Sequence, residues 1–163
     1  MVVSETESRN DPVVVGFDGF YRSTRDRLYR ALVVTIRNRE LAVEAVDEAM
    51  ARAAERWSVV GQYEYPEGWV YRVALNWSRS VFRRRKPVLA ESEAVWDSLP
   101  DPDVAHAVAD LPLRFRTVIV ARYYLDWSVP QISEHFDIPL GTVKSRLHRA
   151  LERLEKSLSK DGS

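Results

Sequence analysis

Two groups of polar side chains in this sequence have the chemistry and the spacing to grip nucleic acid. In the first group, arginines and an asparagine recur at intervals of four, three and four residues: Arg72, Asn76, Arg79 and Arg83. Guanidinium groups pair with phosphates, and an amide can hydrogen-bond a base edge. Arg84, Arg85 and Lys86 add positive charge, and Tyr63 and Tyr65 can stack on unpaired bases. The alternative is a solvated helix face whose basic end complements the helix dipole.

The second group lies near the C-terminus and combines hydroxyl, imidazole and basic side chains: Thr142, Lys144, Ser145, Arg146, His148 and Arg149. On a helical wheel of about 100° per residue, Ser145 and Arg149 point away from the apolar stripe. That stripe contains Val143, Leu147, Ala150, Leu151, Leu154 and Leu158. Arginine can hold a guanine edge with two hydrogen bonds, and hydroxyls can bind bases or phosphates. The pattern predicts a helix that reads the major groove.

Two short helices and a turn would position the second group. Ser128 and Gln131 have the spacing of a capping box, and Pro130 is tolerated early in a helix. That helix is expected over 128–136, the segment DIPLG forms a turn, and a last helix follows over 139–158. The sequence therefore predicts a DNA-binding helix-turn-helix, in preference to a hairpin whose outer face is merely solvated.

The remaining pattern is helical throughout, with apolar residues at spacings of three and four. We expect helices from Phe17 to about Thr35, then over 39–57, 67–86, 104–109 and 112–125. Predicted buried residues in the first two of these helices are Phe17, Phe20, Tyr21, Thr24, Leu28, Ala31, Leu32, Thr35, Ala42, Val46, Ala49, Met50, Ala53 and Trp57. In the third they are Val70, Val73, Ala74, Trp77 and Val81, and Trp57, Trp69 and Trp77 are all expected in the core.

Charge and proline content divide the chain. Residues 66–86 carry six basic and one acidic side chain, whereas residues 87–103 carry five acids, no base and three prolines. The net charge of zero hides this sorting. The predicted fold is all-α, with two small helical domains joined by an acidic Pro-containing linker, the C-terminal one a helix-turn-helix. The expected segments are a flexible arm (1–16), a first domain (17–86), the linker (87–103), a second domain (104–158) and a tail (159–163).

Composition argues against several other classes of protein. The chain has no cysteine and three histidines without metal-ligand spacing, so we expect neither a metal site nor a cofactor. It shows no secretory signal and no apolar run of about 18 residues, which predicts a cytoplasmic protein without membrane insertion. No nucleophile–base pair and no glycine-rich phosphate loop appears, so we expect no catalytic residues and no enzyme.

Three segments taken together resemble an extracytoplasmic-function (ECF) sigma factor, and the resemblance covers about Phe17 to Leu158. RELAVEAVDEAMARAAERW resembles the helix that binds core RNA polymerase. PEGWVYRVALNWSRSVFRRRK resembles the helix that melts and reads the minus-ten promoter element. LPLRFRTVIVARYYLDWSVPQISEHFDIPLGTVKSRLHRAL resembles the domain that reads the minus-thirty-five element. The resemblance implies that core RNA polymerase and promoter DNA are partners, and it leaves open an anti-sigma factor.

The resemblance also implies roles for individual residues. Glu44, Asp47 and Glu48 would face the polymerase clamp, and the loop SVVGQYEYP with Asn76 would hold a base flipped from the non-template strand. Arg79, Arg83, Arg84 and Arg85 would follow the DNA backbone. The upstream element would be contacted by Thr142, Lys144, Ser145, Arg146 and Arg149. The acidic linker would run through the polymerase between the two promoter contacts.

Two other functions fit parts of the sequence. A stand-alone helix-turn-helix regulator would bind DNA without polymerase, but it leaves the basic helix over 67–86 unexplained. A helical adaptor would act through protein contacts alone, and would tolerate loss of Arg146 or Arg149.

Overall fold

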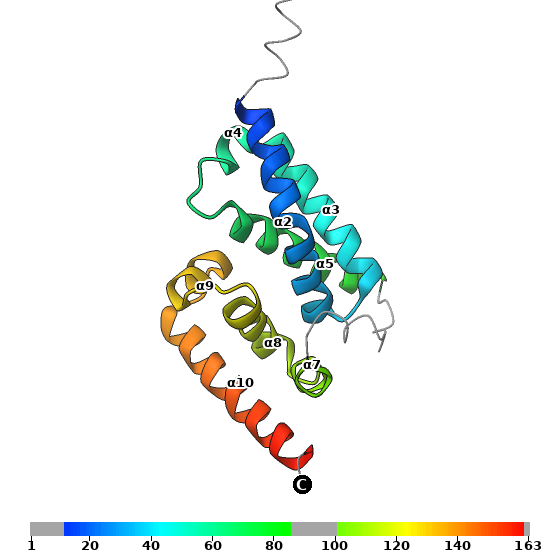
Figure 1. The fold of residues 1–163 in the computed structure, drawn as a ribbon, viewed down its shortest axis with the longest axis vertical. Helices are drawn as coiled ribbons and strands as arrows, with labels where there is room; N and C mark the ends of the chain where they lie inside the picture. Colours follow the sequence, from blue (N-terminus) through cyan, green and yellow to red (C-terminus); the bar gives the residue numbers. More distant parts are fainter. Residues whose placement is uncertain (1–11, 86–100, 162–163) are drawn as a thin grey trace, which may run out of the picture.

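The structure is a computed structural model that describes residues 12–85 and 101–161, with side chains described from Gly16 onward. The first group of helices comprises α2 (Pro12–Ile36), α3 (Arg39–Glu55), α4 (Trp57–Val60) and α5 (Pro66–Arg85). The second comprises α7 (Pro102–Ala109), α8 (Leu113–Ile119), the π-helical turn η1 (Val120–Tyr124), α9 (Val129–Phe136) and α10 (Leu140–Asp161). Figure 1 shows the first group above the second, with α10 along the outer edge. The fold is all-α, as the sequence predicts.

The apolar stripes of α2, α3 and α5 face one another and build the core of the first group. Leu28, Leu32, Val46 and Val70 are fully excluded from solvent. Asn38 begins α3, because its side chain accepts a hydrogen bond from the backbone N–H of Leu41 at 3.0 Å. Most of the predicted buried residues are confirmed, and Trp69 and Trp77 pack half-buried against this core.

Four details differ from the sequence-based expectation. Helix α2 begins at Pro12 rather than Phe17, and proline suits a first helical turn. Helix α7 begins at Pro102, because the Asp101 side chain accepts from two backbone N–H groups, so the predicted linker ends earlier. The loop after α3 starts with the short helix α4. The helix expected over 112–125 changes to a π-helical turn at Val120, where the Leu125 N–H donates to the Val120 carbonyl.

Two predicted core residues are exposed. Tyr21 is 36% exposed, whereas Phe17 and Phe20 of the same helix are half-buried and pack against Trp57. Leu151 is 42% exposed, whereas its neighbour Ala150 is buried. One step along a helix turns a side chain by about 100°, so the buried arc of α10 is narrower than predicted. Leu154 and Leu158 are half-buried rather than buried. Lys86, residues 1–11 of the predicted arm, residues 87–100 of the predicted linker and residues 162–163 of the tail lie outside the described residues.

The two groups of helices pack against each other around a continuous set of buried residues, from Leu28 and Tyr71 to Phe115, Ile132 and Val143. The Tyr71 hydroxyl lies 2.8 Å from the Thr35 hydroxyl, and burial raises the pKa of Tyr71. The Tyr71 ring meets the indole of Trp127 edge-on, with ring centroids 5.5 Å apart. Apolar packing therefore continues from α5 into the second group.

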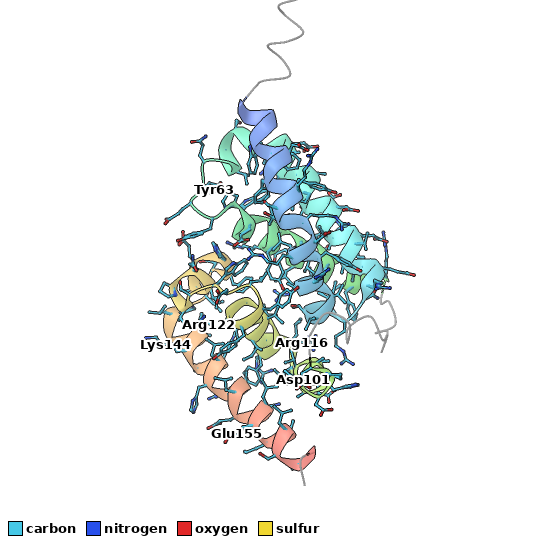
Figure 2. The ribbon with its side chains drawn as sticks, viewed as in Figure 1. Tyr63, Asp101, Arg116, Arg122, Lys144 and Glu155 are labelled. Carbon is cyan, nitrogen blue, oxygen red and sulfur yellow. The ribbon has the colours of Figure 1, made fainter. Side chains whose placement is uncertain are left out.

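Arg116 makes polar contacts across this boundary. Its Nε donates to the Thr35 carbonyl at 2.6 Å, and its Nη1 donates to the carbonyls of Ala109 and Leu111 at 3.1 and 2.8 Å. Arg116 is only 8% exposed, and this burial, with the nearby charge of Arg37, lowers its pKa to about 10. The guanidinium still carries its charge at neutral pH and sits at the negative end of α2. Figure 2 shows Arg116 between the two groups of helices.

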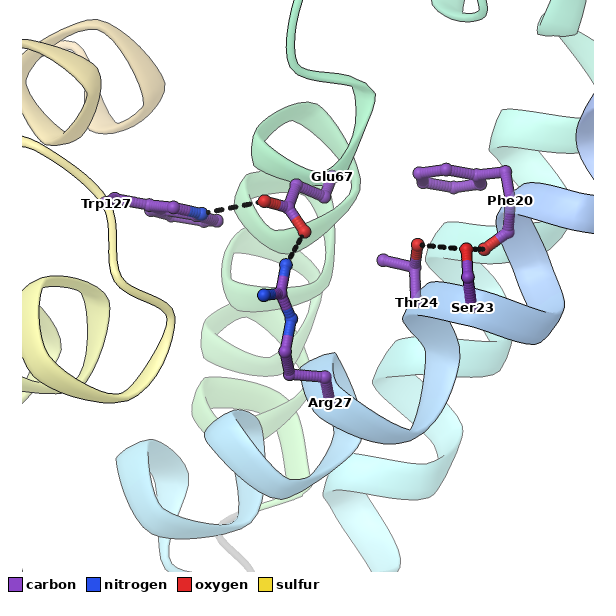
Figure 3. A network of polar contacts seen from close by, with 6 residues as sticks. All are labelled: Phe20, Ser23, Thr24, Arg27, Glu67 and Trp127. Carbon is purple, nitrogen blue, oxygen red and sulfur yellow. Dashed lines mark hydrogen bonds and ion pairs between the residues drawn. The ribbon is translucent and has the colours of Figure 1, made fainter.

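Glu67, in the first turn of α5, makes one further polar contact across the boundary and one within the first group (Figure 3). Its Oε1 accepts a hydrogen bond from Trp127 Nε1 at 3.0 Å, and its Oε2 pairs with Arg27 of α2. The His135 ring also approaches α5 closely, since a Cβ at position 68 would lie 2.3 Å from it. Gly68 therefore has to be glycine for α9 to pack at this distance.

Among the described helices, none combines the length and apolar character needed to cross a bilayer. Within the same part of the chain, no group of three histidine or carboxylate side chains could hold a metal ion.

Candidate nucleic-acid interface

Helix α5 presents most of the first predicted group on one exposed face. Val70, Tyr71, Ala74 and Val81 point inward and fix the rotation of the helix. The exposed side chains at spacings of four, three and four share the opposite face: Arg72, Asn76, Arg79 and Arg83. Arg84 and Arg85 are exposed but point in other directions, and Arg85 pairs with Glu44 of α3. Lys86 lies outside the described residues.

The loop before α5 presents its tyrosines differently. Tyr63 is 44% exposed, and Tyr65 is 37% exposed. Tyr65 also meets the His135 ring edge-on, with centroids 5.9 Å apart. Both tyrosines line a cavity of about 240 Å³ that also includes Trp69 and Arg72. This arrangement leaves Tyr63 available for stacking and places Tyr65 against α9.

The predicted helix-turn-helix is present as α9, a short turn and α10. The capping box of α9 is complete: Ser128 Oγ accepts from the Gln131 N–H at 3.2 Å, and the Gln131 side chain accepts from the Ser128 N–H at 2.7 Å. Asp137 ends α9 with a left-handed φ of 52°. Ser133 Oγ then donates to the Ile138 carbonyl at 2.6 Å, which ties the turn to the first helix.

The buried residues Val143, Leu147 and Ala150 set the rotation of α10. Four predicted DNA-contacting residues are exposed on it: Lys144, Ser145, His148 and Arg149. Two others, Thr142 and Arg146, are half-buried. Ser145 Oγ lies 3.2 Å from the Thr142 carbonyl, and His148 Nε2 lies 3.2 Å from the Glu152 carboxylate. The outward face required for reading a groove is therefore formed.

One residue of the second group, Arg146, shares a cleft of about 450 Å³ with the exposed face of α5, between α5, α8, α9 and α10. Arg72, Asn76 and Arg79 line it from α5, and Arg146 lines it from α10. A volume of this size is that of a small-molecule site. The present arrangement of the helices therefore leaves no space for a DNA duplex between these four residues.

The three acids predicted to face polymerase lie on the surface of α3, and each is already in an ion pair. Arg85 pairs with Glu44 at 3.0 Å, Arg25 with Asp47 at 3.2 Å, and Arg52 with Glu48 at 3.0 Å. Exposed pairs contribute only about 0–1 kcal/mol, so another partner can replace Arg85 and Arg52 at small cost, whereas the Arg25 side chain is partly buried, at 24% exposed.

Several residues of evident structural importance were not singled out in the sequence. Arg116, Glu67 and Trp127 connect the two groups, and Arg114 lines the cleft between them. An arginine inside the apolar pattern RFRTVIV is the only local signal for Arg116. Its partner, the Thr35 carbonyl, is 81 residues away in the sequence, and no short-range pattern reveals such a contact.

Comparison with known proteins places this geometry in a family. The family described as "Sigma-70, region 4" matches residues 103–154, which span α7 to most of α10. The ECF RNA polymerase sigma factor SigW of Bacillus subtilis is 28% identical over 157 residues, covering 82% of this chain and 84% of that protein. The ECF RNA polymerase sigma factor SigL of Mycobacterium tuberculosis is 33% identical over 135 residues, covering 74% and 76%.

A solved structure has the same fold. The sigma factor RpoE of Bartonella quintana, crystallised with the anti-sigma factor NepR, is similar with a TM-score of 0.71 and 20% identity. The likeness covers 88% of this chain and 96% of that one. Because the helix-turn-helix, the basic face of α5 and the 33% identity to SigL all agree, the chain belongs to the ECF RNA polymerase sigma factors.

Proposed function

We propose that this sigma factor uses the exposed face of α5 and the exposed face of α10 to hold the two elements of one promoter. The chain binds core RNA polymerase and promoter DNA, and directs transcription initiation. The observation that carries the assignment of these two faces is that basic side chains remain solvent-exposed on both helices, Arg72, Arg79 and Arg83 on α5 and Lys144 and Arg149 on α10. In this proposal residues 17–86 and 104–158 act as separate domains joined by the linker.

Helix α5 would act at the minus-ten element. Arg79, Arg83, Arg84 and Arg85 follow the phosphates, while Asn76 and the loop over 58–66 hold a flipped base. Tyr63 supports this role, because an exposed aromatic ring beside arginines offers a stacking surface to an unpaired base. Stacking and capture of unpaired bases offset the cost of melting, a few kcal/mol per base.

Helix α10 would act at the minus-thirty-five element. Ser145 and Arg149 project from the exposed face into the major groove, with Lys144, Arg146 and Thr142 beside them. The capped α9 and the tied turn support this role, because they hold α10 at a fixed angle. The exposed acids Glu44, Asp47 and Glu48 of α3 are proposed to exchange their intramolecular partners for basic groups on polymerase.

Promoter binding would require the two groups of helices to separate. Arg72, Asn76 and Arg79 of α5 line one cleft with Arg146 of α10 in the closed arrangement, so these four residues cannot hold two separate promoter elements at once. Two weak DNA contacts joined by a linker gain strength through effective concentration once polymerase holds them apart.

The chemistry of RNA synthesis would belong to the polymerase, with no catalytic role for this chain. We place the protein in the cytoplasm, where bacterial polymerase and promoter DNA meet. An anti-sigma partner is a further proposal, supported by the similar fold of RpoE, which was solved with NepR.

Run-off transcription with purified core polymerase over a promoter library tests the proposed function. We expect promoter-specific transcripts only when this chain is added. Retention of core polymerase in a pull-down separates this function from a stand-alone regulator. A chain that bound promoter DNA but retained no polymerase would favour the regulator.

A further inference from the structure

The cleft between α5, α8 and α10 has an unusual charge distribution. Four arginines from three helices line it: Arg72 and Arg79 from α5, Arg114 from α8 and Arg146 from α10. Among the described residues, its lining includes no aspartate or glutamate. Guanidinium groups gathered in one half-enclosed space repel one another more strongly than they would in open water.

The surrounding chain neutralises these charges poorly. Arg72 reaches Asp137 only at 4.0 Å, and the aspartate side chain is 85% exposed. The Arg114 guanidinium lies over the ring of Phe115, 4.5 Å from its centroid. Within the part of the chain that the structure describes, no carboxylate lies within 4.0 Å of the Arg79 or Arg146 guanidinium. An anion in the cleft would supply the missing negative charge to both groups of helices at once.

The other half of the lining is apolar and identifies the kind of anion. Leu75, Leu113, Val118, Phe136 and Ile138 form this part. An apolar wall can receive an uncharged flat ring, whereas four guanidinium groups match a chain of phosphates with paired hydrogen bonds. The volume of about 450 Å³ is suitable for a ligand of this size and too small for a folded partner.

We propose that the cleft binds a nucleotide carrying two or more phosphates, with the phosphates on the arginines and the base against the apolar wall. Arg114 belongs to this site alone, because it is not among the promoter-contacting residues proposed above. The ligand touches α5 on one side and α8 and α10 on the other, so it binds only the closed arrangement.

If the proposed function holds, a nucleotide in the cleft would also regulate promoter binding, because it would favour the closed arrangement. A ligand that binds one of two states lowers the population of the other by a factor of 1 + [L]/Kd. At a ligand concentration ten times its Kd, the separated form therefore decreases about 11-fold relative to the closed form. The nucleotide would restrain promoter binding by occupying Arg72, Arg79 and Arg146.

Isothermal titration calorimetry of the full chain tests the proposal, with ATP, inorganic tripolyphosphate and a polyglutamate peptide as probes. We expect ATP to bind with at least a tenfold lower Kd than tripolyphosphate. Arg114→Gln and Arg146→Gln, which change separate helices, should each raise the Kd for ATP about tenfold or more. The control Arg30→Gln removes the same charge from an exposed position of α2 and should leave the Kd unchanged.

Each contrary result has a defined meaning. No ATP binding at millimolar concentration, or equal effects of Arg114→Gln and Arg30→Gln, overturns the site. Equal affinity for ATP and tripolyphosphate would show that the cleft does not recognise the nucleoside. Tighter binding of polyglutamate than of ATP would overturn the proposal that the ligand is a nucleotide, in favour of an acidic protein segment. Run-off transcription by the unaltered chain distinguishes failure of the nucleotide site from failure of the proposed function. Normal transcripts without ATP binding in calorimetry refute only the cleft, whereas ATP binding without promoter-specific transcripts refutes only the proposed function.

Discussion

At the scale of single residues, Arg116 has the most demanding environment. Three backbone carbonyls, from Thr35, Ala109 and Leu111, accept hydrogen bonds from one largely buried guanidinium. A buried acceptor that loses its donor costs about 1–3 kcal/mol. The position therefore matters for stability and for the alignment of α2 with α8.

Replacing Arg116 with methionine is expected to lower the free energy of unfolding by about 2–4 kcal/mol, because carbonyls on both sides of the boundary lose their partner. Urea denaturation followed by circular dichroism measures this change. Arg114→Met is the matched control, since Arg114 is exposed and two residues away, and a change within about 0.5 kcal/mol is expected there. Similar losses for the two variants would contradict the role assigned to Arg116.

His135 makes the closed fold sensitive to acid. Its Nε2 is buried and has no hydrogen-bond partner among the described residues, and burial lowers its pKa, with Glu134 and Glu67 opposing the shift. A histidine with a depressed folded-state pKa takes up protons preferentially when unfolded, so stability falls as the pH drops through about 6.5 toward the folded-state pKa. We expect a lower melting temperature at pH 5.5 than at pH 7.5, and a smaller difference for His135→Gln. An equal pH dependence in the two proteins would count against this explanation.

A base-reading arginine should affect promoter binding without affecting stability. Arg149→Ala is expected to weaken binding to the minus-thirty-five element by about 1–3 kcal/mol, because an exposed guanidinium loses its contacts to a base or phosphate. Fluorescence anisotropy with the holoenzyme and labelled promoter DNA gives the affinity. Lys156→Ala removes one positive charge from the same helix outside the proposed interface and serves as the control. Unchanged affinity for Arg149→Ala would support the helical adaptor instead.

At the scale of elements, local signals predicted most of what the structure contains. The spacing of Ser128 and Gln131 predicted the cap of α9, and the cap is formed. The spacing of apolar residues by three and four predicted the rotation of α5, which places Arg72 and Arg79 on its outer face. Both signals act within one or two helical turns. The exposed Leu151 and the π-helical turn at Val120 were missed, because they depend on where neighbouring helices lie.

The cap of α9 helps to hold α10 in position, and its contribution to stability can be measured. Ser128→Ala should lower the free energy of unfolding by about 1 kcal/mol, since a backbone N–H at the start of α9 loses its acceptor. Thermal denaturation measures this loss. Ser159→Ala, near the end of α10, removes a hydroxyl that bonds only within its own helix and is expected to change stability little. A loss as large for Ser159→Ala would show that the effect does not come from the cap.

At the scale of the whole molecule, the sequence predicted two helical units but not their packing against each other. That packing depends on contacts between residues far apart in the chain, such as Trp127 with Glu67 and Gly68 with His135. Composition favours a divided chain, because an acidic segment with three prolines stands between the units. Tertiary contacts of this separation leave no periodic trace, so the shared cleft could not be predicted.

The closed arrangement can be locked chemically, because the chain contains no cysteine of its own. Gly68→Cys together with His135→Cys places two thiols where the histidine ring now meets α5, and we expect oxidation to join them. The oxidised double variant should direct little run-off transcription, and dithiothreitol should restore it, because the helices can then separate. His135→Cys alone and the reduced double variant control for the substitutions, because Gly68→Cys alone would clash with the His135 ring. Full transcription by the oxidised form would show that opening at this boundary is not required.

The continuous buried core has a consequence for the protein outside the transcription complex. Leu28, Tyr71, Phe115 and Ile132 belong to one buried cluster that includes residues of both groups of helices, so separating the groups exposes apolar surface to water. A free molecule with its two groups of helices separated would be prone to aggregate, whereas the closed arrangement would stay monodisperse. In the proposed function, free copies of this sigma factor would therefore keep their apolar boundary covered, and the two groups of helices would separate only where the polymerase surface covers the newly exposed residues.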